Sequence, residues 1–260
     1  MPSEIVRKLT PEEEELLRKR EELASVRAAL AERELELADL RTQLKSFEGR
    51  YLRQVGALYA ELDDWEAKIA EIEASLKPSA AASQRAQETR RQAEETHEAT
   101  HGEASKARDF QPSADLKSLF REAAKRLHPD FAKDEADRQL RTRLMAQLNE
   151  AYGQCDVEAI QRILDEFGNS PESVEGEGVG AELVRIIRQI HQARKNIEAI
   201  EKELSGLRDS EIAQLRHDAE SAQQQGRDLF DELEAEVRER ITSVKNKHET
   251  LLAEAEKRGR

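Results

Sequence analysis

Apolar residues recur at seven-residue spacing through the first third of the chain. The row consists of Leu9, Leu16, Leu23, Leu30, Leu37, Leu44, Tyr51, Leu58, Trp65 and Ile72. A thinner second row accompanies it on the same helical face, which is typical of a coiled-coil seam. The pattern predicts an N-terminal coiled coil over residues 1–77. Its helix is expected to begin at the Thr10-Pro11 capping sequence and to end before Pro78.

A second heptad row occupies the C-terminal part of the chain. It comprises Leu183, Ile190, Ile197 and Leu204, loses its phase between Gly206 and Gln225, and resumes at Phe230, Val237, Val244 and Leu251. This row predicts a second long coiled-coil helix within residues 181–260. Because neither helix can bury its stripe alone, we expect them to pair, either as an antiparallel hairpin or each with its counterpart in a homodimer. The sequence leaves both arrangements open.

Three segments of different character lie between the two heptad regions. Residues 78–111 carry almost no large apolar side chain and predict a polar linker, flexible or partly helical. Residues 112–168 return to an amphipathic pattern and predict a compact module. Residues 169–180 are rich in glycine and predict a second linker. The expected fold class is therefore all-α, with two long coiled-coil helices flanking a small helical module.

The module is predicted to contain three helices. Residues 113–127 form an amphipathic helix capped by Ser113, with an apolar side and a basic outer side. Residues 138–152 form a second helix, antiparallel to the first. Asp156 caps a short third helix that ends at Gly168, and we expect this helix to pack on the other two. The basic outer side of the first helix consists of Lys117, Arg121, Lys125 and Arg126.

The first module helix runs into the sequence His128-Pro129-Asp130. Pro129 cannot donate a backbone hydrogen bond inside a helix, and it moves His128 toward extended geometry. The helix is therefore expected to end at about Leu127, with the three residues forming a rigid corner at the tip of the helix pair. We expect this corner to be displayed, because a proline-restricted loop that holds out an imidazole and a carboxylate loses little entropy on binding.

The run LKSLFREAAKRLHPD at residues 116–130, followed by NEAY at 149–152, resembles the second and third helices and the signature loop of a J-domain, the module of DnaJ-type co-chaperones. The resemblance covers about a fifth of the chain. The usual first helix has no recognisable counterpart, since residues 101–112 offer only Phe110, and Met145 stands where a large aromatic is expected. Long coils around such a module are similar to bacterial J-domain proteins.

The resemblance implies a function in protein binding. Members of the family dock their HPD loop and basic helix on a DnaK-type chaperone and stimulate its ATPase. The coiled coils would then bind an unknown protein client or form a homodimer. The alternative is a structural coiled-coil scaffold with a degenerate, inactive J-like hairpin. Carried over to this chain, the partner-binding residues are His128, Pro129 and Asp130 as the trigger, with Arg121, Lys125, Arg126 and Lys133 as the attracting positive face.

Composition narrows the classes of partner. The chain is 37% charged and 4% aromatic, which leaves too little bulky apolar material for one thick core. Its formal charge of −13 argues against binding to nucleic acid or anionic membranes. The N-terminus lacks the apolar stretch of a signal peptide, and the single cysteine, Cys155, fits a reducing compartment. We expect a cytoplasmic protein.

One stretch matches a catalytic pattern. His97 to His101, HEATH, fits the HExxH motif of zinc proteases, in which two imidazoles and a glutamate share one helical face. Its flanks are polar, Gly102 follows directly, and no third ligand continues the motif, so we interpret it as a chance match. No GxSxG, P-loop or GxGxxG sequence is present. We therefore expect no enzyme activity, no cofactor and no bound metal.

Overall fold

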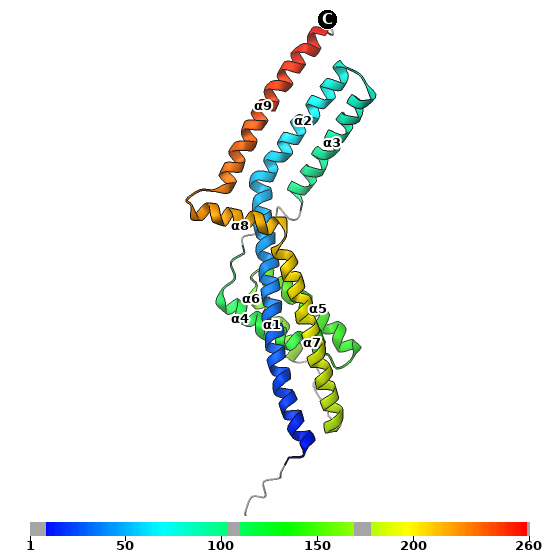
Figure 1. The fold of residues 1–260 in the computed structure, drawn as a ribbon, viewed down its shortest axis with the longest axis vertical. Helices are drawn as coiled ribbons and strands as arrows, with labels where there is room; N and C mark the ends of the chain where they lie inside the picture. Colours follow the sequence, from blue (N-terminus) through cyan, green and yellow to red (C-terminus); the bar gives the residue numbers. More distant parts are fainter. Residues whose placement is uncertain (1–8, 103–109, 169–177, 259–260) are drawn as a thin grey trace, which may run out of the picture. The chain divides into compact units, whose positions relative to one another are not determined.

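The computed structural model describes residues 9–102, 110–168 and 178–258, and within these ranges it contains helices and no strands. This confirms the all-α class. The chain divides into two compact units. Unit 1 comprises residues 1–42 and 110–208, and unit 2 comprises residues 43–109 and 209–260. Figure 1 shows the helices with the labels used below.

The N-terminal heptad region is helical over the predicted range. Helix α1 spans Pro11–Tyr51, a π-helical turn, η1, spans Leu52–Gly56, and α2 spans Ala57–Leu76. The predicted capping box is present, because the Thr10 N–H donates to Glu13 Oε2 at 2.8 Å and the Glu13 N–H donates to Thr10 Oγ1 at 3.3 Å. Helix α2 ends just before Pro78, as expected. The π-helical turn was not predicted.

The C-terminal heptad region is not one long helix, so that prediction is wrong. It forms α7 at Val179–Arg208, α8 at Glu211–Gln224 and α9 at Leu229–Arg258. Ser210 caps α8 by accepting a hydrogen bond from the Ala213 N–H. Gly226, at φ +74°, turns the chain between α8 and α9, a conformation that favours glycine. Both interruptions lie where the heptad row loses its phase.

In unit 1, α1 and α7 pair in parallel along their apolar rows (Figure 1). The ion pairs Arg20–Glu182 and Arg41–Glu203 join residues 162 apart, and Glu22–Arg194 and Glu36–Arg208 join residues 172 apart. A constant separation means that both helices run in the same direction. The midpoint of the two separations pairs the rows in layers, Leu16 with Leu183, Leu23 with Ile190, Leu30 with Ile197 and Leu37 with Leu204.

Of the two arrangements that the sequence left open, the antiparallel hairpin is therefore not formed. The chain between Tyr51, where α1 ends, and Val179, where α7 begins, is long enough for α7 to begin beside the start of α1, which makes a parallel pair possible. Leu23 and Ile190 are buried against this seam within a single chain. The apolar rows of α1 and α7 are thus buried against each other within one chain.

In unit 2, α3 at Ala80–His101 packs on α2, so residues 80–101 of the predicted linker are an ordered helix. Arg90 pairs with Glu71, and Thr96 Oγ1 donates to Asp63 Oδ2 at 2.7 Å, which sets the two helices antiparallel. The sequence allowed a partly helical linker but gave no sign of this packing, because the contact uses small side chains, among them Ala67, Ala70 and Ala93, where sequence reasoning sought large ones. Residues 103–109 of that linker, and 169–177 of the second linker, lie outside the described residues.

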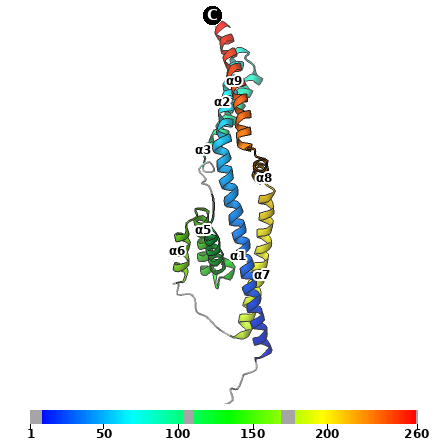
Figure 2. The same cartoon turned by 90° about the vertical axis from the view of Figure 1, so that its left-hand side faces the viewer.

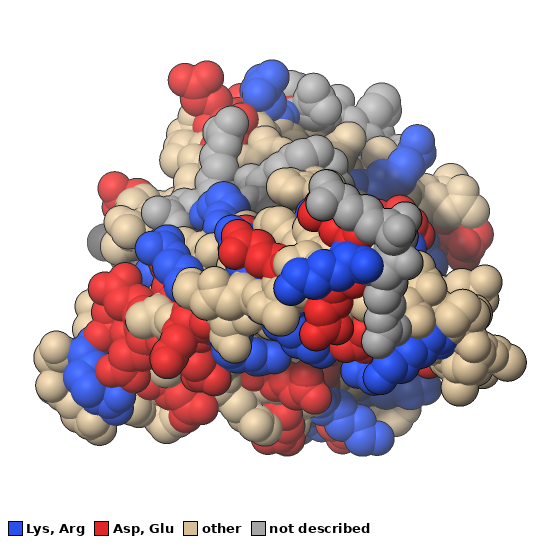
Figure 3. Space-filling model, turned by 90° about the horizontal axis from the view of Figure 1, so that it is seen from above, with Lys and Arg blue, Asp and Glu red and all other residues tan. Residues whose placement is uncertain are grey.

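Helix α9 packs on the other side of α2. Leu62 meets Val237 and Ile241, and Trp65 meets Val244 and His248 further along both helices, so α2 and α9 are parallel. In the view of Figure 3, acidic and basic side chains are intermixed on the surface. Over the ranges that the structure describes, no helix has the length and hydrophobicity required to span a membrane.

The module consists of α4 at Ala114–Leu127, a 3-10 turn, η3, at Pro129–Phe131, α5 at Glu135–Gly153 and α6 at Val157–Gly168. The predicted caps are present: Ser113 accepts from the Leu116 N–H, and Asp156 accepts from the Ala159 N–H. Helices α4 and α5 are antiparallel, and α6 covers them as expected. Their common core contains Leu116, Phe120, Ala123, Ala124, Leu127, Leu144, Met145, Leu148, Ala151, Tyr152, Ile160 and Ile163.

Helix α1 completes this core from outside the module. Ala31, Leu35 and Ala38 are buried in the same cluster as the module's own residues, and Phe110 packs on Tyr152 with ring centroids 5.5 Å apart. Figure 2 shows the module and α7 lying against different sides of α1. The side of the α4–α5 pair left bare by the missing first helix is therefore covered jointly by α6 and α1.

The first prediction tests whether α1 belongs to the module's core. Leu35 is 5% exposed within it, so Leu35→Ala should lower the free energy of unfolding by about 2–5 kcal/mol. Urea melts followed by hydrogen exchange of α4 and α5 measure the loss and its location. Leu17→Ala, at a 45% exposed position of the same helix, should change stability by less than about 0.5 kcal/mol. Equal losses, or unchanged exchange in the module, would contradict the assignment.

Candidate functional site

The HPD corner is formed as the sequence predicts. Helix α4 ends at Leu127, His128 adopts φ −58° and ψ 131°, and Pro129 begins the 3-10 turn. His128 Nδ1 accepts a hydrogen bond from the Asp130 N–H at 3.2 Å. Because Nδ1 is the acceptor, the proton of a neutral imidazole resides on Nε2. The imidazole thus stabilises the turn with one nitrogen and offers the other as a donor.

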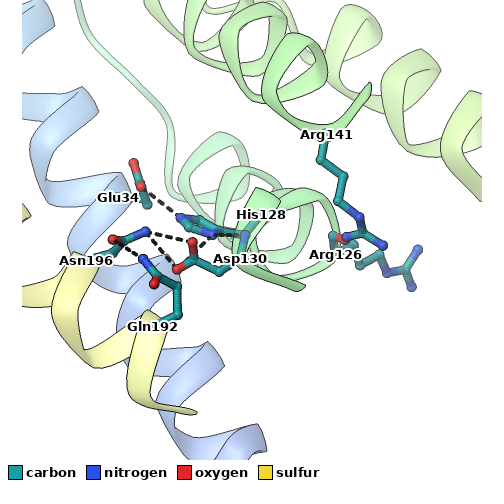
Figure 4. Close-up of polar contacts among 7 residues, drawn as sticks. All are labelled: Glu34, Arg126, His128, Asp130, Arg141, Gln192 and Asn196. Atoms are coloured by element: carbon teal, nitrogen blue, oxygen red, sulfur yellow. Dashed lines mark hydrogen bonds and ion pairs between the residues drawn. The ribbon is translucent and has the colours of Figure 1, made fainter. Parts of the chain in front are cut away.

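That donor is already used within the chain. His128 Nε2 lies 3.2 Å from Glu34 Oε1 of α1, and His128 is only 3% exposed (Figure 4). The expectation of a displayed imidazole is therefore wrong for this conformation. The physical reason is the packing of α1 on the module, which places an acidic side chain of α1 directly against the corner.

The carboxylate of Asp130 is also enclosed. Its two oxygens accept from Asn196 Nδ2 of α7 at 2.7 and 2.8 Å, and its side chain is 6% exposed. Gln192 Nε2 in turn donates to Asn196 Oδ1 at 3.1 Å, which orients the amide (Figure 4). Burial, the largest effect, raises the pKa of Asp130, while the neighbouring His128 acts in the opposite direction. The carboxylate is thus held by α7 and not presented to solvent.

Phe131, directly after the corner, anchors it in the seam between α1 and α7. Its ring is buried with the apolar residues of that seam. The guanidinium of Arg27 on α1 lies 4.2 Å from the ring centroid, a cation–π arrangement. Burial lowers the pKa of Arg27 from its ordinary value. The turn is therefore in contact with both long helices of unit 1, α1 and α7.

The predicted positive face does not form one continuous surface in the structure. Arg121 Nη1 lies 3.6 Å from Glu32 of α1, and Lys117, beside it, lies 2.7 Å from Asp39. Lys125 and Lys133 are exposed, as is Arg126, which pairs with Glu122 at 3.0 Å. The expectation of one continuous basic outer face is therefore wrong, because α1 carries carboxylates opposite its first two members.

Asp39 joins the module to α1 through two contacts. Its Oδ2 atom accepts from Lys117, and its Oδ1 atom accepts from the Tyr152 hydroxyl at 3.1 Å. Burial raises the pKa of Tyr152, and the nearby Asp39 carboxylate raises it further. The NEAY tyrosine therefore supplies a partly buried hydrogen bond as well as apolar surface.

Sequence reasoning missed a brace behind the corner. Arg141 reaches the end of α4, where its Nη1 atom donates to the Arg126 carbonyl at 2.6 Å (Figure 4). Its Nε atom donates to Asp137 Oδ1 at 2.8 Å. Asp137 Oδ2 accepts from the Lys133 N–H at 3.0 Å. The brace ties the end of α4 to the beginning of α5 and so fixes the loop between them. The spacing of Asp137 and Arg141 by four residues, at the beginning of the helix predicted from residue 138, was the available signal.

The partners of the corner were missed as well. Glu34 and Asn196 lie 94 and 66 residues from the side chains they contact, so no local pattern reveals them. Asn196 is an amide beside an apolar seam, a signal of a specific polar contact in a coiled coil. That signal marks the residue without identifying its partner.

The HEATH stretch lies at the end of α3. The rings of His97 and His101 are 4.3 Å apart, which follows from their spacing by one helical turn. In the described part of the chain, no group of three or more histidine, cysteine or acidic side chains is arranged to hold a metal ion.

Comparisons with protein-family models, curated proteins and solved structures found no match to this chain. The resemblance to a J-domain consequently depends on residues 116–130 and 149–152 alone.

The second prediction concerns pH. Burial raises the pKa of Asp130 above 3.8, so the folded chain binds this proton more tightly than the unfolded chain. The contribution of Asp130 to stability is then complete below 3.8 and is lost as pH rises through the raised pKa. Wild-type stability, measured by urea melts relative to Asp130→Asn, should rise as pH falls from neutrality. The control Asp218→Asn, at an exposed position of α8, should show no such rise. A difference for Asp130→Asn that stays constant with pH would contradict the prediction.

The third prediction tests the brace. Arg141→Met leaves Asp137 as a buried charge without its partner, so it should lower the free energy of unfolding by about 3–5 kcal/mol. Arg138→Met, at an exposed position one turn earlier, should cost about 0.5 kcal/mol or less. Thermal or urea unfolding measures both variants. If Arg141→Met lost as little stability as Arg138→Met, the contact of Arg141 with the Arg126 carbonyl would be unimportant.

Proposed function

We propose that this chain is a J-domain-like co-chaperone that docks on a DnaK-type chaperone and stimulates its ATPase. The observation that supports the proposal is the position of His128, Pro129 and Asp130 in the loop between two antiparallel helices, α4 and α5. The exposed side chains of Lys125 and Arg126 lie within one turn of that loop. The sequence resemblance and this local geometry thus agree on one surface.

The proposed mechanism depends on binding and needs no acid–base chemistry. Pro129 and the Arg141 brace fix the loop before it binds, so little conformational entropy is lost on docking. The imidazole of His128 and the carboxylate of Asp130 provide a hydrogen-bond donor and an acceptor for the partner. Lys125, Arg126 and Lys133 attract an acidic partner over longer distances. Hydrolysis of ATP takes place entirely on the chaperone.

The proposal requires a change of conformation. In this structure, which we call the closed arrangement, His128 contacts Glu34 and Asp130 contacts Asn196, so a chaperone cannot contact either side chain. A permanently displayed corner is excluded by this burial. The co-chaperone function therefore requires that at least one of the two long helices leave the corner. The proposed setting is the cytoplasm, because the single cysteine, Cys155, is an exposed thiol of the kind that a reducing compartment keeps free.

The second candidate is a structural scaffold, and the buried corner favours it. Each side chain of the HPD sequence that can form polar contacts has a partner inside unit 1. In that case the corner serves to attach the module to α1 and α7. Its histidine and aspartate would then contribute stability, and no chaperone would be needed to explain them.

The fourth prediction separates the two candidates. Purified chain, added in excess to a DnaK-type chaperone, should raise the single-turnover rate of ATP hydrolysis several-fold. His128→Gln and Asp130→Asn should abolish the increase, and added salt should weaken it because the encounter is partly electrostatic. His217→Gln and Asp218→Asn provide matched controls on the exposed surface of α8 and should stimulate like the wild type. Unchanged ATPase rates with a folded wild-type chain at saturation would favour the scaffold.

A further inference from the structure

The two long helices of unit 1 contact the HPD corner in different ways. Helix α1 is part of the module's hydrophobic core, through Leu35 and its neighbours Ala31 and Ala38. Removing α1 would therefore open the module itself. Helix α7 contributes no residue to that core as described. It meets the module at the 3-10 turn, where Asn196 holds Asp130 and the ring of Phe131 enters the seam.

Helix α7 is held to α1 by an apolar seam, and among the described residues of the module only Phe131 is buried in it. The apolar layers of the seam are reinforced by ion pairs such as Arg20–Glu182 and Glu22–Arg194, which lie on exposed surface. Exposed ion pairs contribute little to stability and weaken with salt. Ile187 and Val184 of α7 remain exposed at the beginning of the pair. The contacts of α7 with the module itself are few, namely the Asn196 amide on Asp130 and the ring of Phe131, whereas its apolar row packs on α1.

We propose that α7 is an autoinhibitory strap that covers the HPD corner and must separate from α1 before a chaperone can bind. This inference rests on the proposed co-chaperone function and adds its regulation. Separation of α7 removes the amide of Asn196 from Asp130 and uncovers that side of the turn, while His128 keeps its contact with Glu34 of α1 until the partner replaces it. The module keeps its fold throughout, because α1, α4, α5 and α6 remain packed together.

The amide of Asn196 is the most specific element of the strap. It donates to both oxygens of one buried carboxylate, so Asn196→Asp replaces two hydrogen bonds by repulsion between two carboxylates. Removing hydrogen bonds to a charged group of this kind shifts a closed-to-open equilibrium by about tenfold or more. The variant alters α7 alone and leaves the HPD sequence intact.

The fifth prediction uses this variant in the full chain. Asn196→Asp should raise hydrogen exchange at residues 128–131 and should increase stimulation of the chaperone ATPase by about tenfold at subsaturating chain. Asn246→Asp makes the same substitution at an exposed position of α9 and should change neither. Circular dichroism verifies that both variants keep wild-type helicity. Exchange at residues 128–131 that does not increase in folded Asn196→Asp would overturn the strap.

A disulfide provides the opposite test. The register of the parallel pair places Leu23 opposite Ile190, so Leu23→Cys with Ile190→Cys should form a bridge that holds α7 on α1. Cys155→Ser removes the only other thiol. The oxidised chain should lose stimulation, and reduction should restore it. Equal stimulation before and after reduction would overturn the strap.

The outcomes distinguish the strap from the function on which it rests. If Asn196→Asp raises exchange at the corner, but neither this variant nor the reduced cysteine pair stimulates the chaperone, the co-chaperone proposal fails. If the wild type stimulates fully and the oxidised pair does so equally, the function stands and the strap is wrong. Stimulation that depends on both Asp130 and release of α7 supports both.

Discussion

The burial of an apolar surface that the module cannot cover alone determines the arrangement of unit 1. Three short helices provide too small a core, and chains of this size are only marginally stable without further burial. Helix α1 provides the missing surface through Leu35 and its small neighbours. Once α1 lies there, its carboxylates necessarily face the basic side of α4. The contacts Glu32–Arg121, Asp39–Lys117 and Glu34–His128 are consequences of that one packing choice.

The position of α7 follows from the same choice. An apolar row on α1 remains open after the module has packed, and the row of α7 fills it in parallel. Because the register is fixed by the seam and by ion pairs on both sides, Asn196 reaches the level of Asp130. Packing of apolar residues thus sets the helix positions, and the polar contacts at the corner depend on those positions.

What the sequence could predict divides between local and distant interactions. Thr10, Ser113, Asp156 and Pro129 each mark a helix end through contacts within a few residues, and all four were located correctly. The parallel direction of the α1–α7 pair was missed. A heptad row indicates that a helix packs against a partner, but it does not indicate in which direction the partner runs. The packing of α3 on α2 was missed because it depends on alanine and threonine side chains, which a search for periodic large residues does not detect.

In the candidate site too, the local contacts were predictable from the sequence and the distant ones were not. The turn itself was predictable, since Pro129 and the Asp130 N–H bond to His128 are local. The contacts of the turn with Glu34 and Asn196 were not predictable, since both residues come from helices distant in the sequence. The closed form also defines what any external partner must offer. A buried donor and a buried carboxylate are costly to leave unpaired, so a molecule that replaces α7 must supply a donor to Asp130 at least as good as the amide it displaces. Guanidinium groups meet that requirement best, because a charged, forked donor binds a carboxylate more strongly than a neutral amide does.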